Sequence, residues 1–152
     1  MTMMAADSVF LDTNGLVFAT IASAPWHEAA VRAIRRLEGA GHDLWISRQI
    51  IREYLAVLSR PQTFGKPVSI AVLVAQIRVF EQRFRVAEES ADVTAKLLDL
   101  LQELSIGGKQ VHDANIVATM QAYGIGRLLT HNVRDFARFA PRIEVIDLEQ
   151  SP

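Results

Sequence analysis

The segment that decides the fold is SVFLDTN, residues 8–14, in which a short apolar run ends at an aspartate, Asp12. An uninterrupted apolar run of this kind is typical of a strand that is buried on both faces of a parallel sheet. The polar residues that follow, Asp12, Thr13 and Asn14, include types that commonly start helices. The segment therefore predicts a buried strand that leads directly into a helix, with a carboxylate at the junction.

The rest of the chain repeats this alternation of short apolar runs and longer helical segments. Strand-like runs recur at residues 44–46, 84–87, 127–130 and 143–147, and the segments between them carry apolar residues at helical spacing. Strands that alternate with helices imply right-handed crossovers and a sheet covered on both faces. The pattern predicts a three-layer α/β/α fold with a parallel sheet of about five strands.

Length and composition predict one globular domain. The chain has 152 residues, of which 50% are apolar and 22% charged, and it contains no cysteine. We expect a single domain over residues 1–152, with residues 1–7 flexible, and the lack of cysteine excludes disulfides and thiolate zinc sites. The chain opens without a basic and apolar leader, and its longest apolar stretch, residues 70–79, is far shorter than the roughly 20 residues of a membrane span. We therefore expect a cytoplasmic protein with no membrane segment.

Acidic and amide side chains stand where strands are expected to end or helices to begin. They are Asp12, Glu53 in a helix that Ser47 is expected to cap, Asp113 at the start of another helix, and Thr130 and Asn132 after the strand 127–130, with Asp135 three residues further on. The carboxyl ends of parallel strands gather at one edge of a sheet, so residues far apart in sequence can meet there. Carboxylates gathered without cysteine or paired histidines favour a hard cation, Mg²⁺ or Mn²⁺.

Electrostatics explains why such a cluster needs a cation. Two carboxylates about 4 Å apart repel each other by about 4 kcal/mol at an effective dielectric constant of 20. Three of them cannot all stay ionised at neutral pH unless a cation compensates their charge. A divalent ion can polarise a phosphoryl oxygen and activate a water molecule as a nucleophile. The cluster therefore points to phosphodiester hydrolysis.

Taken singly, each of these residues has a simpler explanation. Asp12 would serve as a helix N-cap or Asx turn, and Asp113 as a helix cap favoured by the helix dipole. Glu53 lies on a largely apolar helix, where it either faces inward with a partner or is exposed and without a role. The case for a site rests on these residues acting together.

Other chemistries lack their usual motifs. The four histidines show no His-x-x-x-His spacing, and the chain has no phosphate-binding or dinucleotide-binding glycine motif and no Gly-x-Ser-x-Gly elbow. The net charge of −1 argues against broad coating of nucleic acid, but a local basic rim could guide phosphate to an acidic centre. Arg48, Arg52, Lys109 and Arg134 are the candidates for substrate binding; the alternative is that most are solvated surface charges.

Four segments together resemble the ordered motifs of a known family. They are FLDTN at residues 10–14, IIREYL at 50–55, VHDANIVA at 111–118 and LLTHNVRDF at 128–136. In order, spacing and context they resemble the motifs of PIN-domain ribonucleases. More narrowly, the chain is similar to the VapC-type toxins of bacterial toxin–antitoxin pairs, from about residue 8 to residue 148.

The resemblance implies an activity, a cofactor and partners. It implies an endoribonuclease that depends on Mg²⁺ or Mn²⁺ and cleaves single-stranded RNA with a metal-activated water. Such a protein would be the toxin of a type II toxin–antitoxin system, would often form a homodimer, and would be blocked at its acidic cleft by a small cognate antitoxin.

The resemblance also assigns roles by position. Asp12 and Asp113 would be the main metal ligands, and Glu53 would bind metal or orient the attacking water. Thr130 and Asn132 fall on the fourth motif, while Thr13 and Asn14 would be supporting groups. Many members of the family carry an acidic residue where this chain has Asn132. That difference leaves the number of bound metal ions open, and Asp135 is a candidate for the missing charge and for a metal ligand.

Two other classes of function stay open from the sequence. The first is a catalytically silent PIN-like module that binds RNA or protein without cutting. The second is another Mg²⁺-dependent phosphotransfer domain. A receiver domain would need an acidic pair at the first strand and a lysine after the last, and a haloacid-dehalogenase-like phosphatase would need Asp-x-Asp, whereas this chain has Asp12-Thr13-Asn14.

Overall fold

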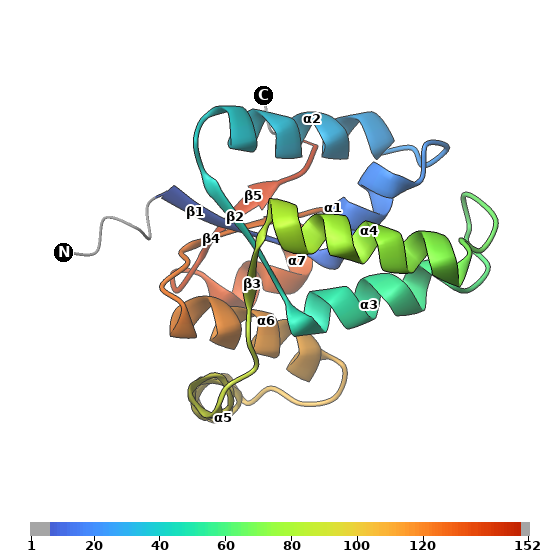
Figure 1. Ribbon diagram of the computed structural model, residues 1–152. Coiled ribbons are helices and arrows are strands. Elements are labelled where there is room, and N and C mark those ends of the chain that lie inside the picture. Colours follow the sequence, from blue (N-terminus) through green and yellow to red (C-terminus); the bar gives the residue numbers. More distant parts are fainter. Residues whose placement is uncertain (1–6, 150–152) are drawn as a thin grey trace.

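A computed structural model describes residues 7–149 of the chain (Figure 1). The segment expected to be flexible, residues 1–7, lies outside this range except for Asp7, so that expectation is not tested. The elements follow in the order β1 Ser8–Leu11, α1 Thr13–Thr20, α2 His27–Gly39, β2 Asp43–Ser47, α3 Arg48–Leu58, α4 Ile70–Arg83, β3 Arg85–Ala87, α5 Ala91–Leu104, α6 Gln110–Ala122, β4 Arg127–Thr130, α7 Val133–Phe136, a short 3-10 helix Ala137–Phe139, and β5 Glu144–Asp147.

The strands form one parallel sheet in the order β3-β2-β1-β4-β5. The predicted five-stranded parallel sheet is confirmed. Strand β1 lies at the centre, where Phe10 pairs with Trp45 of β2 on one side and with Leu128 of β4 on the other. All four residues of β1 are buried, as its apolar sequence predicts.

Helices cover both faces of the sheet, which confirms the three-layer architecture. The chain moves outward from β1 to β2 and β3, so right-handed crossovers carry α1, α2, α3 and α4 over one face. It then returns past β1 to β4 and β5, which brings α5, α6 and α7 to the opposite face. Figure 1 shows α2 and α5 on opposite sides of the sheet.

This topology creates a crevice at the carboxyl ends of β1 and β4. The two strands are neighbours, but the chain leaves them toward opposite faces, and ligand sites of open α/β sheets lie at such switch points. The backbone N–H of Asp12 donates to the carbonyl of Leu129 at 3.0 Å, so the start of α1 is fixed against the end of β4. Residues that directly follow these strands therefore face one another.

Helix caps position the acidic residues. The Asp12 side chain caps α1 and accepts from the Thr13 N–H at 2.8 Å, and Ser47 caps α3, as predicted. The α6 helix begins at Gln110 after Lys109, so Asp113 lies within the first turn and does not cap the helix. The interpretation of Asp113 as a cap is therefore wrong. No helix within residues 7–149 combines the length and the apolar character that a membrane span requires.

Candidate active site

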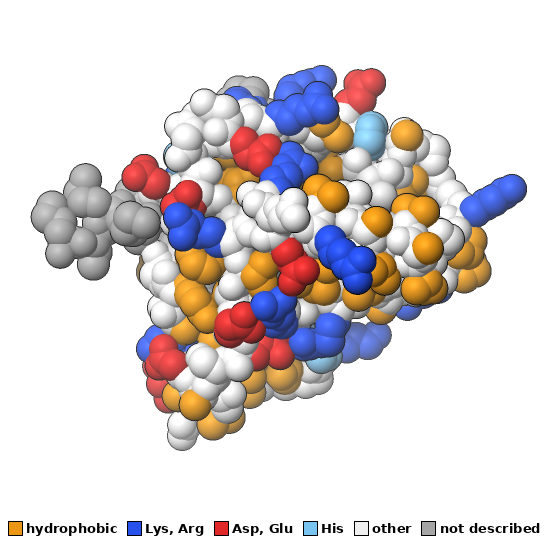
Figure 2. Space-filling view, viewed as in Figure 1, with side chains coloured by type: hydrophobic (Ala, Val, Ile, Leu, Met, Phe, Trp, Pro, Cys, Tyr) orange, Lys and Arg blue, Asp and Glu red, His pale blue; other side chains and the backbone are white. Residues whose placement is uncertain are grey.

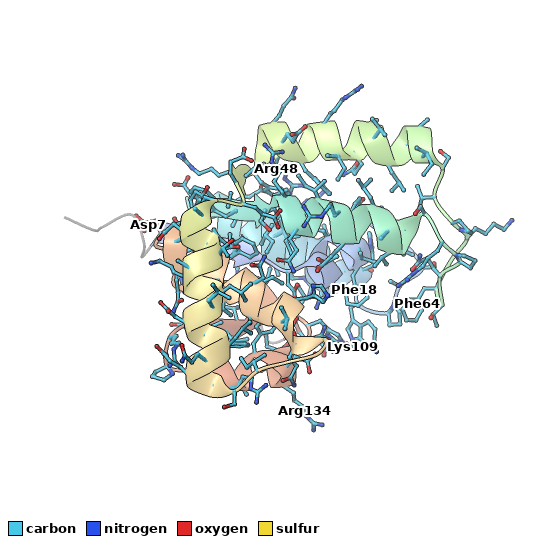
Figure 3. All side chains as sticks on the ribbon, turned by 90° about the horizontal axis from the view of Figure 1, so that it is seen from below. Asp7, Phe18, Arg48, Phe64, Lys109 and Arg134 are labelled. Carbon is cyan, nitrogen blue, oxygen red and sulfur yellow. The ribbon has the colours of Figure 1, made fainter. Side chains whose placement is uncertain are left out.

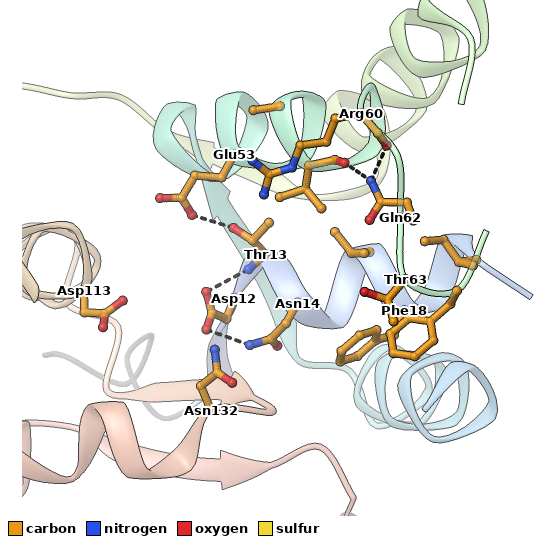
Figure 4. Close-up of a pocket in the computed structure, with 15 residues that line it drawn as sticks. Asp12, Thr13, Asn14, Phe18, Glu53, Arg60, Gln62, Thr63, Asp113 and Asn132 are labelled. Carbon is orange, nitrogen blue, oxygen red and sulfur yellow. Dashed lines mark hydrogen bonds between the residues drawn. The ribbon is translucent and has the colours of Figure 1, made fainter. Parts of the chain in front are cut away.

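A pocket of about 510 Å³ opens at this edge of the sheet (Figure 4). Its lining brings together half of the site residues predicted from the sequence, although they come from the segment directly after β1, from α1, α3 and α6, and from the segment after β4. The predicted residues among them are Asp12, Thr13, Asn14, Glu53, Asp113 and Asn132. Figure 4 shows the carboxylates of Asp12, Glu53 and Asp113 around one space, with the amide of Asn132 at its edge.

Asp12 is held at both of its carboxylate oxygens. The Thr13 N–H donates to Oδ1, while the hydroxyl of Thr130 donates to Oδ2 at 2.7 Å and the amide of Asn14 donates to the same oxygen at 3.2 Å. Asn14 also donates to the Thr130 hydroxyl at 3.2 Å and accepts from the N–H of His131 at 3.0 Å. Asn14 and Thr130 therefore support Asp12 and tie β1 to the end of β4.

Glu53 is fixed by two donors in the same way. The hydroxyl of Thr13 donates to one carboxylate oxygen at 2.7 Å, and the amide of Gln49 donates to the other at 3.0 Å. Gln49 is not among the residues predicted from the sequence. Its signal was available, because a polar residue four positions before Glu53 on a helix shares that residue's face.

Gln49 also joins the two sides of the pocket. Its buried amide donates to the carbonyl of His112 at 2.9 Å and accepts from the amide of Asn115 at 2.7 Å. Both partners belong to α6, the helix that carries Asp113. Gln49 therefore sets the position of α6 relative to Glu53.

Asp113 differs from Asp12 and Glu53 in having no fixed donors. Within residues 7–149 its carboxylate takes part in no hydrogen bond or ion pair, and the side chain is only partly buried. The charges of Asp12, Asp135 and Glu53 nevertheless act on it through space. Asp113 therefore faces the other carboxylates without being tied to them.

Burial and repulsion raise the proton affinity of two of these groups. Burial raises the pKa of Asp12 to about 6; the hydrogen bonds from Thr130 and Thr13 oppose this rise, and the charge of Glu53 adds to it. The pKa of Asp113 is also raised to about 6. Burial is the largest cause, and the negative charges of Asp12, Asp135 and Glu53 raise it further. Ionising both groups near neutral pH therefore costs free energy, which a cation in the pocket would offset.

The residues present fit a hard divalent cation by their chemistry. The pocket offers oxygen donors from carboxylates, a hydroxyl and amides, which suit Mg²⁺ and Mn²⁺. As the side chains stand, no group of three His, Asp or Glu residues in the described range is close enough to bind one ion. Asp12 and Glu53 are engaged with protein donors, so binding an ion would require their oxygens, or that of Asp113, to turn toward it.

The sequence matches the family model described as "PIN domain" over residues 9–141. The chain belongs to the PIN-domain family.

The proteins to which this PIN domain is similar include a ribonuclease and a toxin. The chain is 28% identical over 130 residues to Ribonuclease VapC48 of Mycobacterium tuberculosis. The aligned region covers 84% of this chain and 89% of VapC48. VapBC2 from Rickettsia felis, solved bound to a DNA fragment from its promoter, superposes with a TM-score of 0.68 at 22% identity, over 92% of this chain and 98% of that one. VapC20 of Mycobacterium tuberculosis, described as a toxin that cleaves the sarcin-ricin loop, superposes with a TM-score of 0.59 at 20% identity. The superposition covers 79% of this chain and 86% of VapC20. The resemblance to the family and to VapC-type proteins is confirmed, and the superpositions establish the shared fold.

The fourth motif of this PIN domain divides between two hollows. Asn132 lines the acidic pocket and also a smaller hollow that contains Asp135 and Arg134. Asp135 does not line the acidic pocket, although its charge reaches Asp113. A metal-binding role for Asp135 stays a prediction.

Of the four basic residues predicted to bind substrate, two form ion pairs with glutamates and none lines the acidic pocket. Arg48 pairs with Glu81 at 3.1 Å and Glu88 at 2.7 Å, and Arg52 pairs with Glu89 at 3.0 Å. Figure 3 shows Arg48 well away from Phe18 and Phe64, which mark the far end of the pocket. Figure 2 shows acidic and basic side chains interspersed over the face of the molecule that carries α4. Arg48, Arg52, Lys109 and Arg134 are absent from the pocket lining, whereas Arg60, which the sequence analysis did not select, is part of it.

Proposed function

We propose that this protein is a divalent-metal-dependent endoribonuclease that acts as the toxin of a type II toxin–antitoxin system. One observation carries the proposal. Asp12, Glu53 and Asp113, supplied by three distant segments, line a single pocket at the switch point of a PIN-domain sheet. The similarity to VapC48, which is named a ribonuclease, supports RNA as the substrate.

We assign a task to each side chain on the basis of its place in the pocket. Asp12 and Asp113 would hold Mg²⁺ or Mn²⁺ through their carboxylate oxygens, and a bound ion would polarise a phosphoryl oxygen and make water a better nucleophile. Glu53, oriented by Thr13 and Gln49, accepts a proton from the attacking water. The new bond from the water oxygen to phosphorus forms in line with the bond from phosphorus to the 3′-oxygen, which breaks, and the leaving 3′-oxygen takes up a proton from solvent. The products are a 5′-phosphate and a 3′-hydroxyl.

The proposed partners follow from the relatives and from the surface. Solved neighbours at comparable similarity are a VapBC assembly from Rickettsia felis and a toxin–antitoxin complex from Klebsiella pneumoniae, so we expect a small cognate antitoxin that blocks the acidic pocket. Exposed apolar side chains on α4 and α5, among them Ile70 and Leu98, support an interface such as that of a homodimer. We expect a protein that acts on RNA in this way to work in the cytoplasm.

The test is cleavage of single-stranded RNA by the purified protein with Mg²⁺, with Mn²⁺, or with EDTA. We expect metal-dependent cleavage that falls to background in Asp12→Asn and in Asp113→Asn, while circular dichroism shows both variants folded. Asp99→Asn is the matched control, because this aspartate is exposed on α5 and outside the pocket. Full cleavage by both pocket variants, or cleavage that survives EDTA, would overturn the proposal.

A second candidate is a PIN-like module that binds RNA or protein without cutting. The amide of Asn132 favours it, because this position of the fourth motif lacks a carboxylate and the pocket therefore carries less negative charge to hold metal. Such a module would bind RNA with measurable affinity but show no turnover with Mn²⁺ on any RNA. Turnover that depends on Asp12 excludes it.

A further inference from the structure

The pocket changes character from one end to the other. Near Thr13 it is lined by carboxylates and amides. Its far end is lined by apolar side chains: Val17 and Phe18 of α1, Ile21 directly after α1, Val57 of α3, and Phe64. We call this far part the aromatic end. An acidic metal site alone does not require an apolar extension of this kind, so the aromatic end calls for its own ligand.

The two phenylalanines of the aromatic end are braced from behind by a third ring. Trp26 contacts Phe18 with ring centroids 5.0 Å apart and Phe64 with centroids 6.0 Å apart in an edge-on arrangement. Both phenylalanines are only partly buried, so each keeps some surface open to the pocket. The rings are therefore held in place while still accessible.

The loop that carries Phe64 is fixed by hydrogen bonds at several points. The N–H of Val68 donates to the carbonyl of Leu58 at 2.8 Å, which closes the loop at its base. The side chain of Gln62 donates to the carbonyls of Val57 and Arg60, and the hydroxyl of Ser23 donates to the carbonyl of Phe64. Phe64 is thus held toward α1, and little ordering remains to be done when a ligand binds.

Arg60 supplies a positive charge between the two ends. Its side chain is exposed and, in the described part of the chain, makes no ion pair or hydrogen bond, whereas Arg48, Arg52 and Arg83 are each paired with glutamate. Figure 4 shows its guanidinium reaching from the end of α3 back toward Glu53 and Thr13. A free guanidinium in a pocket is suited to a phosphate group.

We propose that the aromatic end is a nucleobase subsite, in which the base of a nucleotide next to the scissile phosphate packs on Phe18 and Phe64. Arg60 binds the phosphate that joins this nucleotide to the next. The inference rests on the proposed function, because it names how the same pocket holds single-stranded RNA. Aromatic side chains beside a cation are the usual means of holding unpaired bases, since every base has a π face to stack on. An apolar peptide could also pack against Phe18 and Phe64, but it would give the Arg60 guanidinium no anion to bind.

The test uses a short single-stranded RNA in which one base at a time is removed, leaving an abasic ribose. In the wild-type protein, removal of the base that occupies the subsite is expected to lower kcat/KM by about 5- to 100-fold, the range found for base–aromatic stacking. In Phe64→Leu, which keeps apolar volume but has no ring, the same removal should cost about threefold or less. Base removals at other positions should cost the same in both proteins and serve as the internal control.

Two further variants keep the test independent of how Phe64→Leu folds. Phe18→Leu should reduce the same single-base penalty. Arg60→Met should raise KM for RNA and lessen its dependence on salt, while Arg78→Met, which removes the same charge from an exposed site on α4, should do neither.

Binding measured with Ca²⁺ in place of Mn²⁺ separates this inference from the proposed function. If no RNA is cut but fluorescence anisotropy shows the same single-base penalty and its loss in Phe64→Leu, the subsite stands and the nuclease proposal fails. If RNA is cut but every variant keeps the full wild-type penalty, the subsite is overturned and the nuclease proposal stands. RNA kinetics and binding unchanged in Phe18→Leu, Phe64→Leu and Arg60→Met would likewise overturn it and leave an apolar peptide as the occupant.

Discussion

The two walls of the acidic pocket are built on different principles. One wall, which we call the network wall, comes from α1 with its cap Asp12, from α3 and from β4. In this wall both Asp12 and Glu53 accept hydrogen bonds at each carboxylate oxygen. The other wall is α6, from which Asp113 projects without a hydrogen bond among residues 7–149. The two walls carry the same chemical group in very different surroundings.

The difference teaches that similar pKa values can have different structural meanings. Burial raises the pKa of both Asp12 and Asp113 to about 6, but only Asp12 has its charge partly offset by donors. Breaking the network wall therefore removes bonds that stabilise the fold, whereas removing Asp113 mainly relieves repulsion. Stability and activity should respond differently to changes on the two walls.

The largest expected effect is on stability as a function of pH. The pKa of Asp12 rises from 3.8 in the unfolded chain to about 6 in the folded protein, so the folded protein holds this proton more tightly. The stability that protonation of Asp12 contributes is therefore fully present below pH 3.8 and is lost as pH rises through 6. At about 1.4 kcal/mol per pH unit, this is a loss of about 3 kcal/mol. Urea unfolding in EDTA should show this pH-dependent loss in the wild type and a flatter profile in Asp12→Asn. If the substitution leaves the pH profile unchanged, the pKa of Asp12 is not raised by folding.

A smaller but sharper contrast compares one substitution on each wall. Asn14→Ala removes three hydrogen bonds and should lower the free energy of unfolding by about 2 kcal/mol. Asp113→Ala removes no hydrogen bond. It should lower the free energy of unfolding at pH 7 by about 0.5 kcal/mol at most, or raise it by relieving repulsion. Chemical denaturation of both variants in EDTA measures the contrast. Equal losses would show that the two walls are built alike.

Gln49 connects the two walls by hydrogen bonds, so replacing it should affect both stability and RNA cleavage. Gln49→Met keeps the volume but removes the contacts to Glu53, His112 and Asn115. We expect unfolding to become easier by about 1–2 kcal/mol and RNA cleavage to fall by about tenfold, because Glu53 loses a donor and α6 loses its tie. A loss of stability with unchanged kcat would give Gln49 a purely structural role.

The smallest effect should come from outside the pocket. Arg52 pairs with Glu89 on the surface, and both side chains are well exposed. Arg52→Met should therefore change the free energy of unfolding by less than about 1 kcal/mol. The same variant tests the sequence-based prediction that Arg52 binds substrate, since a rise in KM for RNA would support that prediction and an unchanged KM would not.

The sequence was sufficient for the features that depend on local pattern and on topology. Apolar runs such as residues 8–11 identified the strands, and the gathering of strand ends at one edge predicted that Asp12, Glu53 and Asp113 would share a pocket. The caps at Asp12 and Ser47 were also predictable, because capping is decided within a few residues.

What could not be predicted depends on which side chains meet across elements. The hydrogen bond from Thr13 to Glu53 joins residues 40 positions apart, and the ion pairs of Arg48 and Arg52 use glutamates more than 30 positions away. Arg60 was overlooked because it stands beside Pro61 at a helix end, where the sequence indicates only a stop. Pairings of this kind require the packed structure.

The central place of β1 in the sheet has a consequence for how the protein is made. Strand β1 is the first to leave the ribosome, yet it needs β4 beside it, and Asp12 is bonded to Leu129 and Thr130. A growing chain therefore holds Asp12 without these partners until residues 129 and 130 have been translated and have left the ribosome. A nascent chain that stops short of β4 lacks the assembled pocket on which the proposed nuclease activity depends.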